Sequence, residues 1–335
     1  MQRVVVGLSG GVDSAVCAML LRKQGFEVHG LFLDQGLSAR ADAERTAAAM
    51  GVPLHIADIR SELERAVCAP FAAAYLSGET PNPCILCNPA VKFKALLDCA
   101  DALGAHYVAT GHYAVTEERD GVTLLRRSPS RNDQSYMLCR LTQPVLRRVL
   151  FPLGIFGEKE DVRRAAESMG IPIAHKPDSM EICFIPGNDY GAYLESRGVS
   201  PPPGDFVDEQ GNVLGRHLGI HRYTVGQRRG LGIAGTGRYY VKEIDAVQNR
   251  VIITYEDPKA TEIFVRDVSY TVQPRTQPFD AAVKIRHSKN DWRARVYPEE
   301  DCARVVFDPP ARAPAKGQSA VFYDGDIVIG GGFIV

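Results

Sequence analysis

The sequence predicts an α/β protein in three parts: a parallel-sheet domain over residues 1–142, a small linking domain over 143–200, and a β-rich region over 201–335 that ends in a β-barrel. The first 110 residues alternate between short β-branched runs and segments of helical periodicity. The pattern changes near Gln143–Pro144. A triple proline, Pro201–Pro203, then precedes short apolar runs separated by glycine, aspartate, asparagine and proline.

The amino-terminal part alternates strands with helices. We expect strands at 4–6, 28–33, 54–57 and 107–109, and helices at 14–24, 39–50, 61–75 and 91–103. Gly25, Gly51 and Gly104 follow three of these helices, where a left-handed residue often ends a helix. This alternation predicts a parallel sheet with helices on both faces and ligands at the carboxyl ends of the strands.

The remaining elements are a helix and a series of short strands. Glu158–Gly170 predicts a charged helix in the linking segment. Beyond Pro203, runs such as YYVKEIDAVQNRVIITY, ARVVF and SAVFYDGDIVIGGGFIV are typical of a β-barrel.

Composition favours a cytoplasmic protein that uses thiol chemistry. No apolar run approaches the roughly 20 residues that span a bilayer, so we expect no membrane attachment. Because no long exposed seam is evident, we expect a monomer. Eight cysteines at irregular spacing favour thiol or metal chemistry over a disulfide framework.

The net charge of −1 is unevenly distributed along the chain. Residues 126–148 hold six arginines and one acid, residues 215–229 hold four arginines, two histidines and no acid, and residues 281–295 hold five lysines and arginines against one aspartate. Any one such cluster is more often a solvated surface. Three together favour a polyanionic partner such as a nucleic acid.

A glycine-rich segment, GLSGGVDS at Gly7–Ser14, links the first expected strand to the first expected helix. It lacks the lysine of a Walker A loop and does not fit the dinucleotide pattern GxGxxG. Its adjacent glycines let the backbone approach an anion, its serines add hydroxyl donors, and the helix dipole favours negative charge there. We therefore expect a phosphate-binding loop in preference to a structural turn, with Asp13 placed to help hold Mg²⁺.

A second segment, TPNPCILCN at Thr80–Asn88, places two cysteines three residues apart. Thiols at this spacing can bind a metal, act as a redox pair or supply a catalytic thiolate. The spacing does not decide among these three chemistries.

Seven short segments stand out and follow one another along the chain in this order: SGGVDS (9–14), TPNPCILCNPAVKF (80–93), ATGHYA (109–114), NDQSYML (132–138), DSMEICFIPG (178–187), YTVGQRRGLG (223–232) and GQSAVFYDGD (317–326). Together they resemble the bacterial tRNA-specific 2-thiouridylases of the ATP pyrophosphatase superfamily, over essentially the whole chain. The resemblance implies an adenine nucleotide alpha hydrolase-like fold for the amino-terminal domain. It also implies an enzyme that adenylates the C2 oxygen of the wobble uridine in tRNAs for Lys, Glu and Gln, and then replaces that oxygen with sulfur.

The resemblance further implies roles for individual residues. ATP is expected to contact Gly7, Leu8, Ser9, Gly10, Gly11, Val12, Asp13, Ser14, Leu33 and Gly111. The target base is expected to contact Asn82, Pro83 and Cys84. The tRNA is expected to contact His112, Asn132, Asp133, Gln134, Arg286, His287 and Gln318. The barrel residues among these agree with the basic cluster at 281–295, which was found from charge alone.

The resemblance implies that Cys87 is the nucleophile and that Cys183 carries sulfur as a persulfide. Many family members have an aspartate where this chain has Cys84, so the acid–base role of that position is in doubt here. Instead, the three cysteines match the set that holds a [4Fe–4S] cluster in other thiolases, with one iron open to hydrosulfide.

Two mechanisms therefore stay open. In the first, slightly favoured by Cys84, the cluster delivers sulfide to the adenylated base. In the second, a persulfide on Cys183 attacks the base, and Cys87 then releases the sulfur and leaves a Cys87–Cys183 disulfide. A structural zinc is a third alternative, although no fourth ligand is evident. Either thiolation route needs a sulfur donor, a protein or sulfide.

Two other functions compete with thiolation. An adenylating synthetase that forms amides or guanidines would share the phosphate loop, but it needs neither paired thiols nor an RNA-binding barrel. An RNA-binding protein with a structural metal would leave SGGVDS unexplained.

Overall fold

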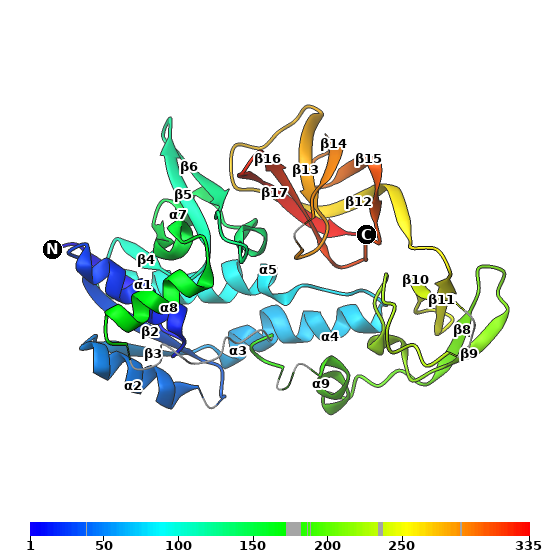
Figure 1. Ribbon diagram of the computed structural model, residues 1–335, viewed down its shortest axis with the longest axis horizontal. Coiled ribbons are helices and arrows are strands. Elements are labelled where there is room, and N and C mark those ends of the chain that lie inside the picture. The colour runs from blue at the N-terminus through cyan, green and yellow to red at the C-terminus, as the bar shows by residue number, and fades with distance from the viewer. Residues whose placement is uncertain (38, 172–181, 186, 188, 234–236, 289) are drawn as a thin grey trace.

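The computed structural model describes the chain except for residues 38, 172–181, 186, 188, 234–236 and 289. Figure 1 shows a parallel-sheet domain at the amino-terminal end, a β-barrel that contains the carboxyl terminus, and a smaller sheet farthest from the amino terminus. Among the described residues, no helix is both long and apolar enough to cross a membrane.

A five-stranded parallel sheet forms the centre of the first domain, in the order β3-β2-β1-β4-β7. Its strands are β1 (Arg3–Gly7), β2 (Glu27–Asp34), β3 (Leu54–Asp58), β4 (Tyr107–Ala109) and β7 (Val149–Leu150). The four strands expected in this region are confirmed. The added strand β7 lies in the segment that we expected to form a linking domain, so part of that segment completes the first sheet.

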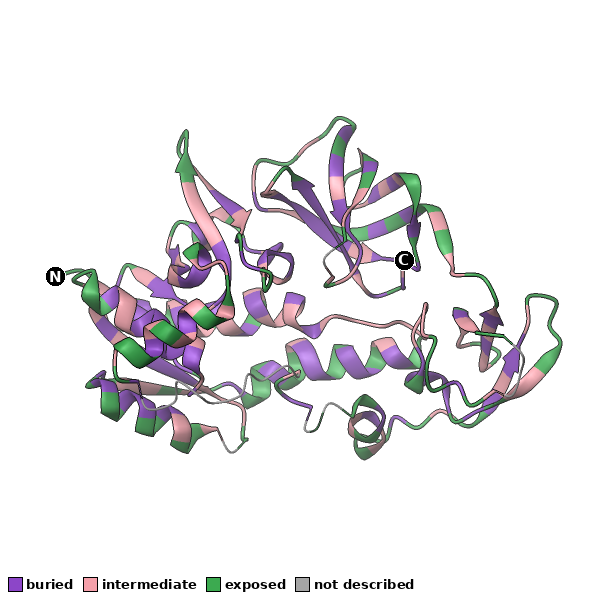
Figure 2. Ribbon diagram, in the orientation of Figure 1, coloured by how far each residue is buried: buried purple, intermediate pink, exposed green. Residues whose placement is uncertain are grey.

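Helices cover both faces of the sheet, as expected. The side chains of Val4 and Val6 pack with α1 (Val12–Lys23), α2 (Arg40–Met50) and α8 (Lys159–Ser168). Val5 points to the opposite face and packs against α6 (Phe93–Ala102). Since all three valines are fully buried, β1 is the central strand of a three-layer domain. In Figure 2 the buried residues concentrate along these strands and the inner faces of the helices.

Two long helical segments run beside the sheet. The first joins α3 (Arg60–Leu63), a π-helical turn at Glu64–Cys68 and α4 (Ala69–Leu76). The second joins α5 (Pro83–Cys87), a π-helical turn at Asn88–Lys92 and α6. The helix expected to begin at Val91 therefore begins eight residues earlier. Pro83 opens it, and Asn82 caps it by accepting a hydrogen bond from the backbone N–H of Cys84 at 3.1 Å.

A hairpin that we did not expect connects the first domain to the barrel. It consists of β5 (Ala114–Arg119) and β6 (Val122–Arg127), and its turn residues Asp120 and Gly121 both have positive φ, at 51° and 74°. An Asp-Gly pair is a strong hairpin signal, so the sequence did contain it. Strand β6 pairs with β17 of the barrel.

Short elements connect these parts. They are the 3₁₀ turns Ser135–Leu138, Pro152–Ile155 and Ile220–Arg222, and the helices α7 (Gln143–Leu146) and α9 (Tyr190–Ser196). Next comes a four-stranded sheet in the order β10-β11-β8-β9, from β8 (Gly204–Val207), β9 (Val213–His217), β10 (Tyr240–Asp245) and β11 (Arg250–Thr254).

Six antiparallel strands form the expected carboxyl-terminal barrel. They are β12 (Lys259–Tyr270), β13 (Phe279–Lys284), β14 (Trp292–Pro298), β15 (Ala303–Arg312), β16 (Ser319–Asp324) and β17 (Ile327–Ile334). Pairing of β12 with β17 closes the ring. Tyr136 fixes the barrel to the first domain by donating a hydrogen bond from its buried hydroxyl to the carbonyl of Ser319 at 2.9 Å.

Candidate functional site

The predicted ligand residues gather at the carboxyl edge of the parallel sheet. Gly7 ends β1, Leu33 lies near the end of β2, and Gly111 follows β4, which is the neighbour of β1. Because parallel strands end at one edge, these three segments meet there. The glycine-rich loop begins at this edge and leads into α1.

Close backbone packing fixes the shape of the glycine-rich loop. Gly10 has φ of 74°, and a Cβ there would lie 2.8 Å from the backbone nitrogen of Ala43. A Cβ on Gly111 would lie 2.9 Å from the backbone carbon of Asp13. Neither position has room for a side chain, so both glycines are required by the packing of the loop.

The amino terminus of α1 presents backbone donors with no side-chain cap. Gly11 is its N-cap residue and, within the described part of the chain, makes no side-chain cap hydrogen bond. The Ser14 hydroxyl instead donates to the carbonyl of Gly11 at 2.9 Å and accepts from the backbone N–H of Ser9 at 3.3 Å. The side chains of Leu8 and Val12 are buried, so these two residues can offer only backbone groups to a ligand. This arrangement suits an anion.

Asp13, expected near Mg²⁺, already has two partners. Lys159 at the start of α8 approaches one of its carboxylate oxygens to 2.5 Å, and the Tyr113 hydroxyl donates to the other at 3.0 Å. We did not single out Lys159 or Tyr113 from the sequence.

The second predicted group is the set of three cysteines. Cys84 and Cys87 lie one turn apart on α5. Cys183 is exposed, but its neighbours Ile182 and Phe184 pack in the same apolar cluster as Cys87. The Gln35 amide just beyond β2 also reaches the carbonyl of Cys183, at 3.5 Å. The structure therefore brings a distant segment to the two cysteines of α5.

The environment of these thiols favours their protonated form. Burial raises the pKa of Cys87 to about 12, while the charge of Lys92 opposes the rise and the thiols of Cys183 and Cys84 add to it. Desolvation likewise raises the pKa of Cys84, and it raises that of Cys183 although part of this residue is exposed. The mutual electrostatic effect of the thiols reflects their proximity.

Lys92 acts on the thiols through its charge and contacts a residue next to the segment that packs on the glycine-rich loop. Its ammonium lies 3.4 Å from Nε2 of His112, and Nδ1 of His112 lies 2.7 Å from the Thr110 hydroxyl. Burial and Lys92 both lower the pKa of His112, so this ring is neutral. Since an ammonium can only donate, Nε2 accepts and Nδ1 carries the proton. Gly111, which packs on the loop, lies between Thr110 and His112.

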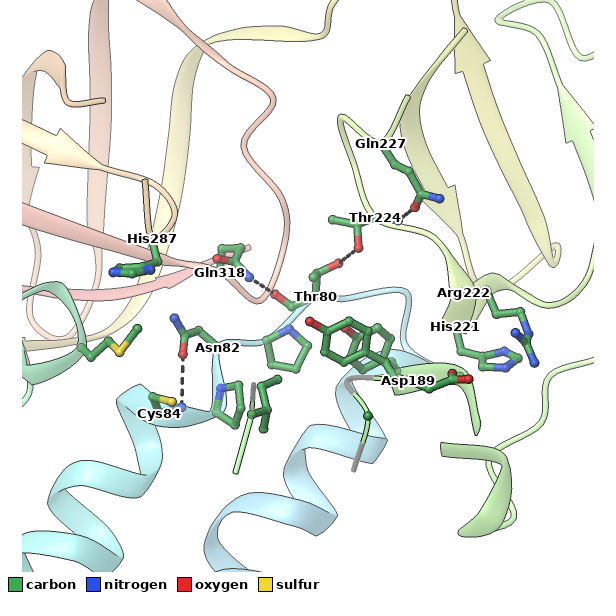
Figure 3. Close-up of a pocket in the computed structure, with 18 residues that line it drawn as sticks. Thr80, Asn82, Cys84, Asp189, His221, Arg222, Thr224, Gln227, His287 and Gln318 are labelled. Carbon is green, nitrogen blue, oxygen red and sulfur yellow. Dashed lines mark hydrogen bonds between the residues drawn. The ribbon is translucent and has the colours of Figure 1, made fainter. Parts of the chain in front are cut away.

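A cavity of about 760 Å³ opens beside Cys84. Figure 3 shows Asn82 and Cys84 at one end, with His287 above these two residues, and His221 and Arg222 at the other end. The glycine-rich loop is not part of its lining. The cavity therefore opens the edge of the thiol site to a large ligand, separately from the glycine-rich loop.

Thr80 joins all three parts of the molecule at this cavity (Figure 3). Its carbonyl accepts a hydrogen bond from the Gln318 amide in the barrel at 2.7 Å. Its hydroxyl lies 3.3 Å from that of Thr224, which precedes the four-stranded sheet's β10. The cavity wall is thus built from segments that are far apart in the sequence, since 238 positions separate Thr80 from Gln318.

Three family models match consecutive parts of the chain. They are the tRNA methyl transferase HUP domain over residues 2–187, the tRNA methyl transferase PRC-barrel domain over 192–255, and the aminomethyltransferase beta-barrel domain over 260–334. The tRNA-specific 2-thiouridylase MnmA 1 of Clostridium botulinum is 43% identical, with 99% of each chain covered. MnmA of Acetivibrio thermocellus is also 43% identical, again over 99% of each chain. This chain belongs to the tRNA-specific 2-thiouridylase family.

Several of the residues expected to contact tRNA in this 2-thiouridylase are engaged within the protein. Asp133 accepts hydrogen bonds from Ser128 and Ser135 and pairs with Lys284 at 3.6 Å. The Gln134 amide oxygen accepts from the backbone of Tyr113 at 3.0 Å.

The other expected tRNA contacts differ in exposure. His112 is only 9% exposed, whereas Asn132 and His287 are exposed. The Arg286 guanidinium donates to the carbonyl of Ala313, and burial lowers its pKa. Contact of these residues with tRNA stays a prediction, and His287 and Gln318 are the two that line the cavity.

Little in the sequence pointed to the 2-thiouridylase residues that we missed. Lys92 and Thr80 stand inside the segment TPNPCILCNPAVKF, but neither has a pattern of its own. Lys159 stands in a helix that is rich in charged residues, and its contact with Asp13 depends on how α8 packs on α1.

Proposed function

We propose that this protein is an ATP-dependent tRNA 2-thiouridylase: it adenylates the C2 oxygen of the wobble uridine, releases pyrophosphate, and then replaces the oxygen with sulfur and releases AMP. One observation carries the proposal. Lys92, whose charge acts on all three thiols, contacts His112, which belongs with Gly111 to the segment that packs on the glycine-rich loop. Activation by ATP and displacement by sulfur require such adjacent sites.

The cavity supports a flipped nucleobase as the substrate. Its volume of about 760 Å³ exceeds that of one nucleoside, and its Cys84 end is the end nearest Cys87. Asn82 offers a side-chain amide donor there, because its oxygen is occupied by the N–H of Cys84. Arg222 and His287 line the same cavity and suit the RNA backbone. We propose the tRNAs for Lys, Glu and Gln as its substrates.

We propose the persulfide route for the displacement step, because the neighbours of Cys183 pack in the same apolar cluster as Cys87. A sulfur donor, a protein or sulfide with an oxidant, loads Cys183 as a persulfide. Its terminal sulfur attacks C2, the C2–O bond breaks, and AMP leaves with the oxygen. The Cys87 thiolate then attacks Sγ of Cys183, which forms the Cys87–Cys183 disulfide and leaves the second sulfur on the base as 2-thiouridine. An external dithiol reduces the disulfide.

A [4Fe–4S] cluster would supply an iron-bound sulfide in place of the persulfide. Cys84, Cys87 and Cys183 would be its ligands. Among the described residues, however, no three His, Cys, Asp or Glu side chains are arranged to hold one metal ion. The thiols as placed do not fit a shared metal group, so the cluster stays a prediction. Iron and sulfide analysis of anaerobically purified protein tests it.

Thiolation of unmodified tRNA tests the proposed function. With ATP, Mg²⁺, a persulfide donor and tRNA for Lys, Glu or Gln, we expect 2-thiouridine and AMP in equal amounts, measured by mass spectrometry of nucleosides. Cys87→Ser should abolish product, while the matched Cys99→Ser, on α6 outside the cavity, should not. No product from wild-type protein, or a normal rate with Cys87→Ser, would contradict the proposal.

A further inference from the structure

The persulfide route leaves one thiol of the site without a role. Sulfur transfer uses Cys183 as the carrier and Cys87 as the nucleophile, and it ends with a disulfide between these two residues. Cys84 takes part in neither step. It is nevertheless close to both, since the charge of its thiolate would raise the pKa of Cys87 and that of Cys183. A third thiol beside a disulfide is suited to thiol–disulfide exchange.

The helix places Cys84 at disulfide distance from Cys87. The two residues stand three apart on α5, and α-helical geometry separates the Cα atoms of such a pair by about 5 Å. Protein disulfides join Cα atoms that are roughly 4.4–6.8 Å apart. The side chains of residues three apart also lie on the same face of a helix. A Cys84–Cys87 disulfide therefore needs only a small adjustment of the first turn.

Cys84 is the member of this pair that opens to the cavity. It lines the cavity of about 760 Å³, as Figure 3 shows, whereas Cys87 packs against the apolar cluster behind it and is not part of the lining. A small reductant that enters the cavity therefore reaches Cys84 before Cys87. Cys183 is exposed and is not part of the lining either, so a sulfur donor can load it without entering the cavity.

We propose that Cys84 resolves the Cys87–Cys183 disulfide and transfers it to the cavity. The Cys84 thiolate attacks Sγ of Cys87, the Cys84–Cys87 bond forms, and the Cys87–Cys183 bond breaks. Cys183 leaves as a thiolate and takes up the proton that Cys84 has lost. An external dithiol then attacks Sγ of Cys84 and releases Cys87, and its second thiol releases Cys84 as the reductant becomes a disulfide.

The exchange frees Cys183 for the next persulfide while Cys84 and Cys87 await reduction. The proposal rests on the proposed function, in which the target base lies at the Cys84 end of the cavity. Because the base covers Cys84 until the product leaves, the exchange follows sulfur transfer. The Cys87–Cys183 disulfide is therefore the first to form, and the Cys84–Cys87 disulfide is the second.

Cys68 is the competing thiol. It packs in the same apolar cluster as Cys87, and its thiolate charge would likewise raise the pKa of Cys87 and that of Cys183. However, Cys68 is only 5% exposed and does not line the cavity. A disulfide to Cys68 would be out of reach of a reductant in the cavity, so Cys84 is the better resolving thiol.

Disulfide mapping of the wild-type, full-length protein tests the proposal. Enzyme with persulfide on Cys183 is mixed with ATP, Mg²⁺ and unmodified tRNA without reductant. Portions are quenched with acid at increasing times, treated with N-ethylmaleimide and digested. The first portions should contain the Cys87–Cys183 cross-link. Later portions should contain Cys84 and Cys87 joined within one peptide, and Cys183 should carry the maleimide. A Cys87–Cys183 cross-link that persists, or a Cys68–Cys87 cross-link in its place, would overturn the role of Cys84.

Two variants sharpen the comparison. Cys84→Ser should keep the Cys87–Cys183 cross-link at all times, in an amount equal to the 2-thiouridine that it forms. Cys68→Ala, the matched control, should show the same exchange as the wild-type protein. The wild-type time course decides the question even where Cys84→Ser makes no product. Absence of 2-thiouridine from the wild-type protein would instead overturn the proposed function, which keeps the two failures distinct.

Discussion

At the scale of single residues, the protonation of Cys87 is the property that most limits its chemistry. A thiolate is the nucleophile, yet burial holds the pKa of Cys87 at about 12. At pH 7 nearly all of this thiol is protonated. Lys92 is the group whose charge opposes this shift at Cys84, Cys87 and Cys183 alike.

The first prediction concerns the pH dependence of Cys87 reactivity. A raised pKa means a smaller thiolate fraction at any pH below it, so at pH 8 Cys87 should react with iodoacetamide much more slowly than glutathione does. The rate should then rise about tenfold per pH unit from pH 8 to 10 without levelling. Mass spectrometry of the alkylated peptide measures it. A plateau near pH 8.5 would show an ordinary thiol.

The second prediction concerns Lys92. Since its charge lowers the pKa of all three thiols, Lys92→Met should raise those values and slow alkylation of Cys87 several-fold further. The rate of 2-thiouridine formation should fall by about tenfold or more. Lys94→Met, two residues along the same helical segment but exposed, is the control. Equal rates in the two variants would refute the assignment.

At the scale of elements, periodicity predicted the strands and helices that bury one or both faces. The three adjacent valines Val4, Val5 and Val6 identified β1 because a central parallel strand is apolar throughout. The β5–β6 hairpin was missed because its residues are mixed in polarity and it lies between catalytic-domain motifs. Its Asp120–Gly121 turn was the sign that should have identified it.

Barrel closure gives the third prediction. Strand β17 carries consecutive glycines, and a Cβ on Gly331 would lie 2.5 Å from the carbonyl oxygen of Ala320 on β16. Gly331→Ala should therefore lower the free energy of unfolding by about 1–3 kcal/mol. Denaturant titration measures it. Gly157→Ala, where a Cβ meets nothing within 4 Å, should be close to neutral. Equal stability of both variants would show that β17 adjusts freely.

The candidate site shows which functional residues a sequence can reveal. The glycine-rich loop and the paired cysteines were found because each is a short continuous pattern. The convergence of Cys183 with Cys87 came only from a resemblance, since 96 residues separate them. Lys92 and Lys159 gave no local pattern, because nothing in a sequence distinguishes a lysine that meets a distant side chain from one in solvent.

At the scale of the whole molecule, the cavity exists because three parts meet at Thr80. The barrel reaches it through Gln318, and the segment before β10 reaches it through Thr224. Neither contact involves the glycine-rich loop. Under the proposed function, RNA bound at the cavity and nucleotide bound at the loop would depend on different contacts, and we expect them to be separable by mutation.

The fourth prediction tests this separation. Gln318→Ala removes the hydrogen bond to the Thr80 carbonyl and should weaken tRNA binding by about fivefold, with ATP affinity unchanged. Filter binding at one fixed salt concentration measures the first, and calorimetry the second. Gln248→Ala, an exposed residue in the turn between β10 and β11, is the matched control. A loss of ATP affinity would contradict the independence of the two sites.

The most direct measurement is the state of two thiols after one turnover. Enzyme loaded with persulfide on Cys183 is mixed with ATP, Mg²⁺ and unmodified tRNA, quenched with acid, and digested without reductant. We expect a peptide cross-linked between Cys87 and Cys183 in an amount equal to the 2-thiouridine formed. Product that forms without this disulfide would contradict sulfur transfer between the two cysteines.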